Sequence, residues 1–118
     1  MLETTRRAPQ PTRVTVKPGI CGFATTIEVT TTNKRRLSVK INSDCDLVNS
    51  LGKAIKELEQ WEALKPKEQS MVYLSASKCS LHSGCLVPCA IIKATEVAAG
   101  LALPQDASIH FDNTKQGG

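Results

Sequence analysis

The residues of this 118-residue chain best suited to chemistry are five cysteines: Cys21, Cys45, Cys79, Cys85 and Cys89. A cysteine thiolate is both a nucleophile and a ligand for metals such as zinc and iron. Because five is an odd number, the cysteines do not make a complete set of disulfide pairs, and we expect free thiols or metal ligands. Two classes of function follow: metal binding and thiol chemistry.

The metal-binding hypothesis places one ion or cluster on several of these thiols. Four mostly thiolate ligands suit zinc or an iron–sulfur cluster, and either is the expected cofactor. Such a centre would serve electron transfer, sensing or metal handling. No C-x-x-C pair occurs, so the spacing matches no standard zinc or ferredoxin motif. The predicted ligands are Cys21, Cys45, Cys79 and Cys85, with Cys89 or His82 as alternates.

Two other interpretations compete with a metal centre. In the first, Cys85 is the reactive thiol of a persulfide carrier or thiol-redox protein, a neighbouring cysteine resolves it, and the partner is a redox or sulfur-transfer protein. In the second, the cysteines are incidental residues of a structural or interaction module, because free cysteine is often buried. Cys89, inside an apolar helical segment, is expected in such a core. No Ser-His-Asp constellation, phosphate loop or carboxylate pair stands out, so an enzyme of those classes is not expected.

Alternating apolar residues predict the strands that position the cysteines. Phe23–Thr30 and Leu37–Ile41 alternate in this way, and the short polar segment Asn33–Arg36 joins them. This pattern is typical of a β-hairpin. Val14 and Val16 also alternate with polar neighbours and would allow a short edge strand before the hairpin, in addition to the four strands counted below.

Apolar residues three or four positions apart predict two helices. The first is Leu47–Trp61, which follows a capping residue, Ser43, with the acidic Asp46 three positions later. The second is Ala90–Ala99, and Gly100 stands at its expected C-terminal cap. Each helix would begin close to a cysteine.

Two short segments rich in β-forming residues, Met71–Ala76 and Ala107–Phe111, complete the predicted elements. The order ββαβαβ predicts an α+β fold, a two-layer sandwich of two helices on a four-stranded mixed sheet with parallel crossovers. This topology brings Cys21, Cys45, Cys79 and Cys85 to one edge of the sheet, beside two helix N-termini that favour negatively charged groups. The uncovered face of the sheet would allow a homodimer.

Composition limits the remaining classes of function. We expect a disordered basic tail at residues 1–13, one domain at 14–112 and a flexible end at 113–118. The net charge is +4 and only four residues are aromatic, so nucleic-acid binding is not expected. The longest apolar stretch is interrupted by Lys93 and Glu96, which disfavours a membrane span. With no secretory signal recognised, a cytoplasmic location is expected.

Several strings of residues resemble a known family. They are Pro18–Phe23, Ser43–Cys45, His82–Pro88 and Lys93–Pro104. They look like those of a family of small uncharacterised bacterial and archaeal proteins, catalogued as a domain of unknown function, over Val14 to Phe111. That resemblance implies no activity. A looser similarity links Cys85-Leu86-Val87-Pro88 to the Cys-Pro-x-Pro motif of TusA-type sulfur carriers, whose cysteine holds a persulfide; here leucine replaces the first proline.

Overall fold

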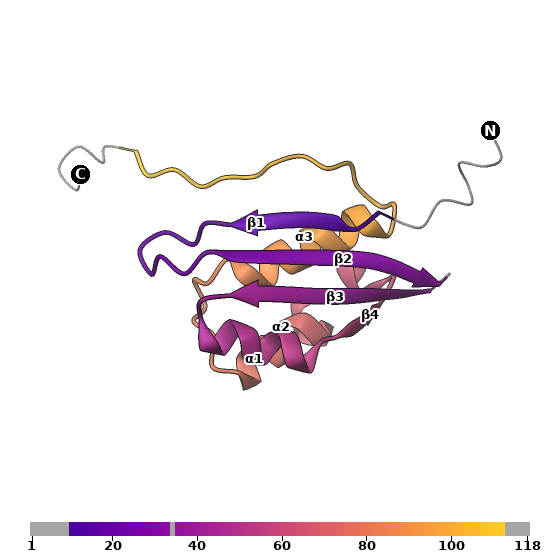
Figure 1. The fold of residues 1–118 in the computed structure, drawn as a ribbon, viewed down its shortest axis with the longest axis horizontal. Helices are drawn as coiled ribbons and strands as arrows, with labels where there is room; N and C mark the ends of the chain where they lie inside the picture. Colours follow the sequence, from indigo (N-terminus) through magenta and orange to yellow (C-terminus); the bar gives the residue numbers. More distant parts are fainter. Residues whose placement is uncertain (1–9, 34, 113–118) are drawn as a thin grey trace.

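The computed structural model describes residues 10–33 and 35–112 of the chain. Most of the predicted tail at 1–13, all of the predicted flexible end at 113–118, and Lys34 in the predicted hairpin turn lie outside the described residues. Figure 1 shows the arrangement of the elements. In chain order they are β1 (Thr12–Val16), β2 (Thr25–Asn33), β3 (Arg36–Ser43), α1 (Asp46–Ala54), β4 (Glu57–Glu59), the 3₁₀-helices η2 (Glu62–Leu64) and η3 (Lys67–Gln69), α2 (Met71–Lys78) and α3 (Val87–Ala98).

The sheet follows chain order, β1-β2-β3-β4, and every neighbouring pair is antiparallel. β2 and β3 form the predicted hairpin, in which Ile27 pairs with Ile41 and Val29 with Val39. Alternate residues of β2 are buried from its first residue onward, because successive side chains of a strand point to opposite faces. The hairpin prediction is confirmed.

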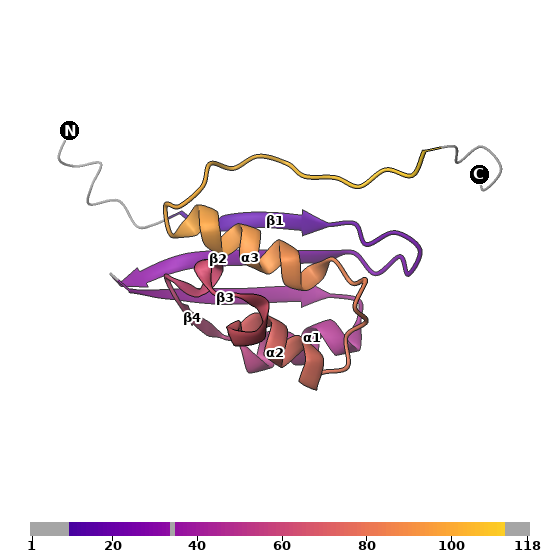
Figure 2. The same ribbon diagram turned by 180° about the vertical axis from the view of Figure 1, so that it is seen from behind.

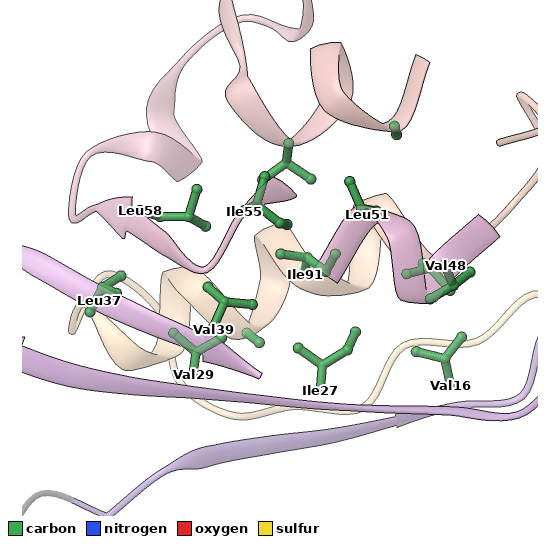
Figure 3. Packing of buried hydrophobic residues seen from close by; sticks show 14 residues of the cluster. Val16, Ile27, Val29, Leu37, Val39, Val48, Leu51, Ile55, Leu58 and Ile91 are labelled. Carbon is green, nitrogen blue, oxygen red and sulfur yellow. The ribbon is translucent and has the colours of Figure 1, made fainter. Parts of the chain in front are cut away.

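The hydrophobic core lies between the sheet and the helices. α3 packs across β1 and β2, and α1 lies beside β3 (Figure 2). Strands, α1 and α3 each contribute side chains to the cluster in Figure 3. Its labelled members are Val16, Ile27, Val29, Leu37, Val39, Val48, Leu51, Ile55, Leu58 and Ile91. The predicted α+β class with a four-stranded sheet is confirmed, with three α-helices instead of two.

The prediction of a mixed sheet is wrong, because the segment Met71–Ala76 is a helix and not a strand. Ser70 is the N-cap of α2, and its Oγ accepts a hydrogen bond from the backbone N–H of Tyr73 (3.2 Å). The buried carboxylate of Glu62 accepts two more, from the Ser70 hydroxyl (3.0 Å) and the backbone N–H of Val72 (3.3 Å). These acceptors satisfy N–H groups that the first turn of a helix leaves open. With a helix there, no parallel crossover arises.

Two further elements differ from the prediction. The helix predicted at Leu47–Trp61 ends at Ala54, because Ile55 turns into the core, where it is 1% exposed, and the chain continues into β4, which pairs with β3. The strand predicted at Ala107–Phe111 does not form, and these residues are exposed, without a strand partner.

Helix α3 confirms the second predicted helix and its cap. Gly100 adopts a φ of +79°, a conformation that side chains with a Cβ rarely take. Its N–H donates to the Val97 carbonyl (3.0 Å), and the N–H of Leu101 donates to the Glu96 carbonyl (2.8 Å). Together these bonds close the helix in a Schellman motif. None of the helices in the described ranges is long and apolar enough to span a bilayer.

Candidate functional site

The segments that carry the cysteines meet at one end of the sheet. There β1 and β3 end, β2 begins and α1 starts, and the connection from α2 to α3 passes the same end (Figures 1 and 2). The hairpin and the end of α2 bring these segments together, in place of the expected parallel crossovers. Cys21 lies between β1 and β2, Cys45 precedes α1, Cys79 and Cys85 lie between α2 and α3, and Cys89 lies in the first turn of α3.

This shared location does not amount to a preassembled metal centre. Within residues 10–33 and 35–112, no three His, Cys, Asp or Glu side chains form a group that could hold a metal ion. Cys21 and His82 are exposed. Cys45, Cys79 and Cys85 are each half-buried and pack against the hydrophobic core. Binding of zinc or an iron–sulfur cluster therefore stays a prediction, and it would require these segments to rearrange.

A network of hydrogen bonds around Ser43 holds Cys45 at the start of α1. The Ser43 Oγ accepts a hydrogen bond from the backbone N–H of Cys45 (3.0 Å) and another from the Thr25 hydroxyl (2.7 Å). The side-chain amide of Asn49 bonds both backbone groups of Ser43 (2.8 and 3.2 Å). Cys45 is the N-cap residue, and its side chain makes no capping bond. The prediction that Ser43 caps this helix with Asp46 is wrong, because Cys45 is the N-cap residue and the Ser43 hydroxyl accepts its hydrogen bonds in the turn before the helix.

Helix α2 ends in a tight turn that leads to Cys85. Ser80 takes the left-handed conformation with φ 65°, and the N–H of Leu81 donates to the Ala76 carbonyl (3.0 Å). The N–H of Cys85 donates to the His82 carbonyl (3.0 Å). Leu81 and Cys85 both pack, half-buried, against the core. The connection is thus held at both ends, and access to the Cys85 thiol is restricted.

Cys89 is exposed in the first turn of α3, so the expectation that it belongs to the core is wrong. The face of α3 that meets the core carries Val87, Ile91 and Ala94, each at most 1% exposed. Their spacing of three and four residues leaves Cys89 outside this face. The N-terminal turn of a helix favours negative charge. Lys93, four residues later, shares the exposed side with Cys89.

The side chain of Tyr73, in α2, lies against Cys89. Burial raises the pKa of the Tyr73 hydroxyl above its ordinary value of 10.0, and the charge of Cys89 and a side-chain hydrogen bond to Cys89 raise this pKa further. The phenol therefore keeps its proton near neutral pH and can donate that proton in a hydrogen bond to the sulfur. On the ring of Tyr73, the Nζ of Lys67 lies 5.3 Å from the centroid, a cation–π contact.

The hydrogen bonds that begin α2 also position this tyrosine. Tyr73 lies in the first turn of α2, and its own N–H is the one that Ser70 accepts. Ser70 is in turn bonded to the buried Glu62. Glu62 and Ser70 thus orient the helix turn from which the phenol reaches Cys89.

The reasoning from sequence missed Tyr73 because it placed this residue in a strand. A signal was present: Ser70 stands directly before the apolar segment, as an N-cap does before a helix. The spacing of Val87, Ile91 and Ala94 shows which face of α3 is apolar, but only the packing of that face against the core leaves Cys89 exposed. The pairing of Tyr73 with Cys89 was not readable, because it depends on how two helices pack.

Neither of two hollows on the surface is lined by a cysteine. One, of about 150 Å³, lies at the end of the β2–β3 hairpin beside Asp44. The other, of about 870 Å³, is open to solvent and lies between β3 and α1, with Lys53 and Lys56 on its border. The Cys89 thiol stands instead on an exposed helix surface. A group that reacts with it can therefore be presented by another macromolecule, without entering a pocket.

The comparisons with known proteins give a family and no activity. The chain belongs to the family of unknown function DUF6951, which matches residues 12–111. This match extends from the first residue of β1 to Phe111 and includes all five cysteines. No curated protein and no solved structure matches the chain.

Proposed function

We propose that this DUF6951 protein carries out thiol–disulfide exchange with a partner protein through Cys89, with Tyr73 as a positioning hydrogen-bond donor. The observation that carries the proposal is the exposed Cys89 thiol in the first turn of α3, paired with a tyrosine that keeps its proton. A thiolate is the attacking species in such exchange, and both the helix N-terminus and a hydroxyl donor favour negative charge on sulfur.

The exchange proceeds in two balanced steps. The Cys89 thiolate attacks one sulfur of a disulfide in the partner; a mixed disulfide forms, the original S–S bond breaks, and its electron pair leaves on the second sulfur. A second cysteine thiolate then attacks the Cys89 sulfur: a disulfide forms between these two cysteines, the mixed disulfide breaks, and its electron pair leaves on the partner's sulfur, so the partner departs with both of its sulfurs reduced and this chain is oxidised. Cys85 is the cysteine nearest to Cys89 along the chain and is the proposed resolving residue.

The test uses the reduced full chain and a disulfide such as oxidised glutathione, with the site of modification followed by mass spectrometry. Cys89 should react fastest, and Cys89→Ser should remove the fast phase. Cys21→Ser is the matched control, since Cys21 is also exposed but has no described tyrosine partner, and it should keep that phase. Tyr73→Phe should slow Cys89 about twofold, because the loss of ~1 kcal/mol from one hydrogen bond to the thiolate is about half offset by the greater nucleophilicity of the less stabilised sulfur. Unchanged kinetics in both Cys89→Ser and Tyr73→Phe would exclude the proposal.

The second candidate function is the metal centre, and the meeting of the cysteine-bearing segments at one sheet end is the observation that favours it. Anaerobic purification followed by measurement of iron and zinc per chain tests it directly. Under this hypothesis Cys45→Ser abolishes metal retention, whereas under the exchange hypothesis the same variant leaves the reaction of Cys89 unchanged. A persulfide on Cys85, as in the sulfur carriers, would instead appear as the mass of one added sulfur atom that Cys85→Ser removes.

A further inference from the structure

The segment that follows α3 exposes large apolar side chains. Every residue from Leu101 to Asp112 is exposed, and the segment forms neither helix nor strand. It contributes Leu101, Leu103, Ile109 and Phe111 to the exposed large hydrophobic residues of the described chain, and the last two are 68% and 79% exposed. The family match nevertheless extends to Phe111, so this segment is part of the family's domain.

The last five residues of this match, Ala107–Phe111, have the pattern of a strand. The His110 Nε2 and the Ser108 Oγ lie 3.1 Å apart, so these two side chains share one side of the chain. In an extended chain, Ile109 and Phe111 then occupy the other side. A segment with one polar and one apolar side is typical of a strand that covers a core, yet it pairs with no strand in the part of the chain that the structure describes.

The sheet offers an open edge of the same length. β1 pairs with β2 on one side only, and its five residues form one border of the sheet. β4 forms the opposite border; it has three residues, and the outer two, Glu57 and Glu59, are exposed carboxylates. Short charged edges resist strand addition, whereas the outer backbone groups of β1, which pair with no other described strand, are available for it. Val14 and Val16 face the core from β1, so an added strand could continue this apolar face.

The chain's own β1 is poorly placed to receive Ala107–Phe111. The segment after α3 runs past β1, and its yellow end reaches beyond the β1 arrowhead in both views (Figures 1 and 2). Pro104, three residues before the strand-like part, lacks the N–H that a ladder needs. Six residues, 101–106, precede the strand-like part and span about 20 Å when extended, enough to reach a neighbouring molecule.

We propose that Ala107–Phe111 adds as a fifth strand to the β1 edge of a second copy of this chain, in a reciprocal, two-fold symmetric exchange. Both partners then bury Ile109 and Phe111 and pair the open edge of β1. The β1–β2 connection near that end exposes Ile20 and Phe23, which the arriving strand can also cover. This interface uses the sheet edge, not the uncovered sheet face.

The experiment measures the mass of the full chain by sedimentation over a wide range of concentration, together with hydrogen exchange of the amides of residues 107–111. We expect twice the 12.7 kDa of one chain, with these amides protected. The double variant I109D/F111D should sediment as a monomer and lose the protection. The matched control L64D/L74D changes two exposed leucines that lie outside the segment Ala107–Phe111, and it should remain a dimer.

Three results would overturn the proposal. The first is a monomer at every concentration, whether its amides are unprotected or are protected by the chain's own β1. The second is a dimer that I109D/F111D leaves intact, which would place the interface elsewhere. The third is an equal loss of the dimer in I109D/F111D and L64D/L74D.

Discussion

Replacing Glu62 by alanine should destabilise the fold and loosen the candidate site together. The Glu62 side chain is 2% exposed and accepts hydrogen bonds from the Ser70 hydroxyl and from the backbone N–H of Val72. Glu62→Ala leaves both donors without their acceptor, and each buried unsatisfied group costs about 1–3 kcal/mol. The ion pair with Lys65 (3.3 Å) adds little, because the Lys65 side chain is 35% exposed and solvent screens it. We therefore expect a loss of about 3 kcal/mol.

Urea denaturation measures this loss directly, and in a domain of this size it corresponds to a fall in Tm of roughly 12 °C. Glu59→Ala is the matched control, because Glu59 is an exposed carboxylate that approaches the same Lys65 (3.8 Å). It should change stability by less than about 0.5 kcal/mol. In folded Glu62→Ala, the pKa of Tyr73 should also move back toward its ordinary value, since α2 loses the bonds that begin it. A loss below about 1 kcal/mol, or an equal loss in Glu59→Ala, would refute this account of how α2 is held.

Further predictions concern the tyrosine and the cap of α3. Tyr73 is the chain's single tyrosine, so the absorbance of tyrosinate reports its ionisation, which should occur above pH 10. Cys89→Ala should lower the pKa of Tyr73, but the pKa should stay above its ordinary value because the phenol remains partly buried. Because the raised pKa means that folding favours the neutral phenol, its contribution to stability is complete below about pH 10 and is lost as the pH rises through the folded pKa. Denaturation between pH 8 and 11 should show that loss, and Tyr73→Phe should remove it; a titration at or below pH 10 would contradict both. Gly100→Ala should cost about 1 kcal/mol because of its positive φ, whereas Gly84→Ala, with open space around it and no positive φ, should be neutral by thermal denaturation.

The parts of the fold that sequence predicts well depend on residues close together along the chain. The β2–β3 hairpin follows from strict alternation, since successive side chains of a strand must point to opposite faces. Likewise α3 follows from apolar residues three and four positions apart and from Gly100, which ends it. In both elements, the spacing that the local conformation gives to the apolar residues is also the spacing that places them in the core.

The segment Met71–Ala76 shows where such reasoning fails. Its residues suit a strand, but the buried carboxylate of Glu62, eight residues before Ser70, accepts the hydrogen bonds that begin a helix. A similar contact ends α1, because Ile55 enters the core and Leu58 pairs with Leu37 in β3. Both outcomes depend on which distant groups become neighbours; the sequence offers Ser70 as an N-cap residue, but no local pattern records its contact with Glu62 or the entry of Ile55 into the core.

For the candidate site, the sequence by itself determined the chemistry: five cysteines, and the helix that begins beside Cys85 and Cys89. Only the tertiary structure decided which thiol is available and what accompanies it. The core takes one face of α3 and leaves Cys89 outside it, and the packing of α2 against α3 brings Tyr73 to that sulfur. Accessibility and side-chain pairing are properties of packed surfaces, so they follow from the arrangement of helices and not from the order of residues.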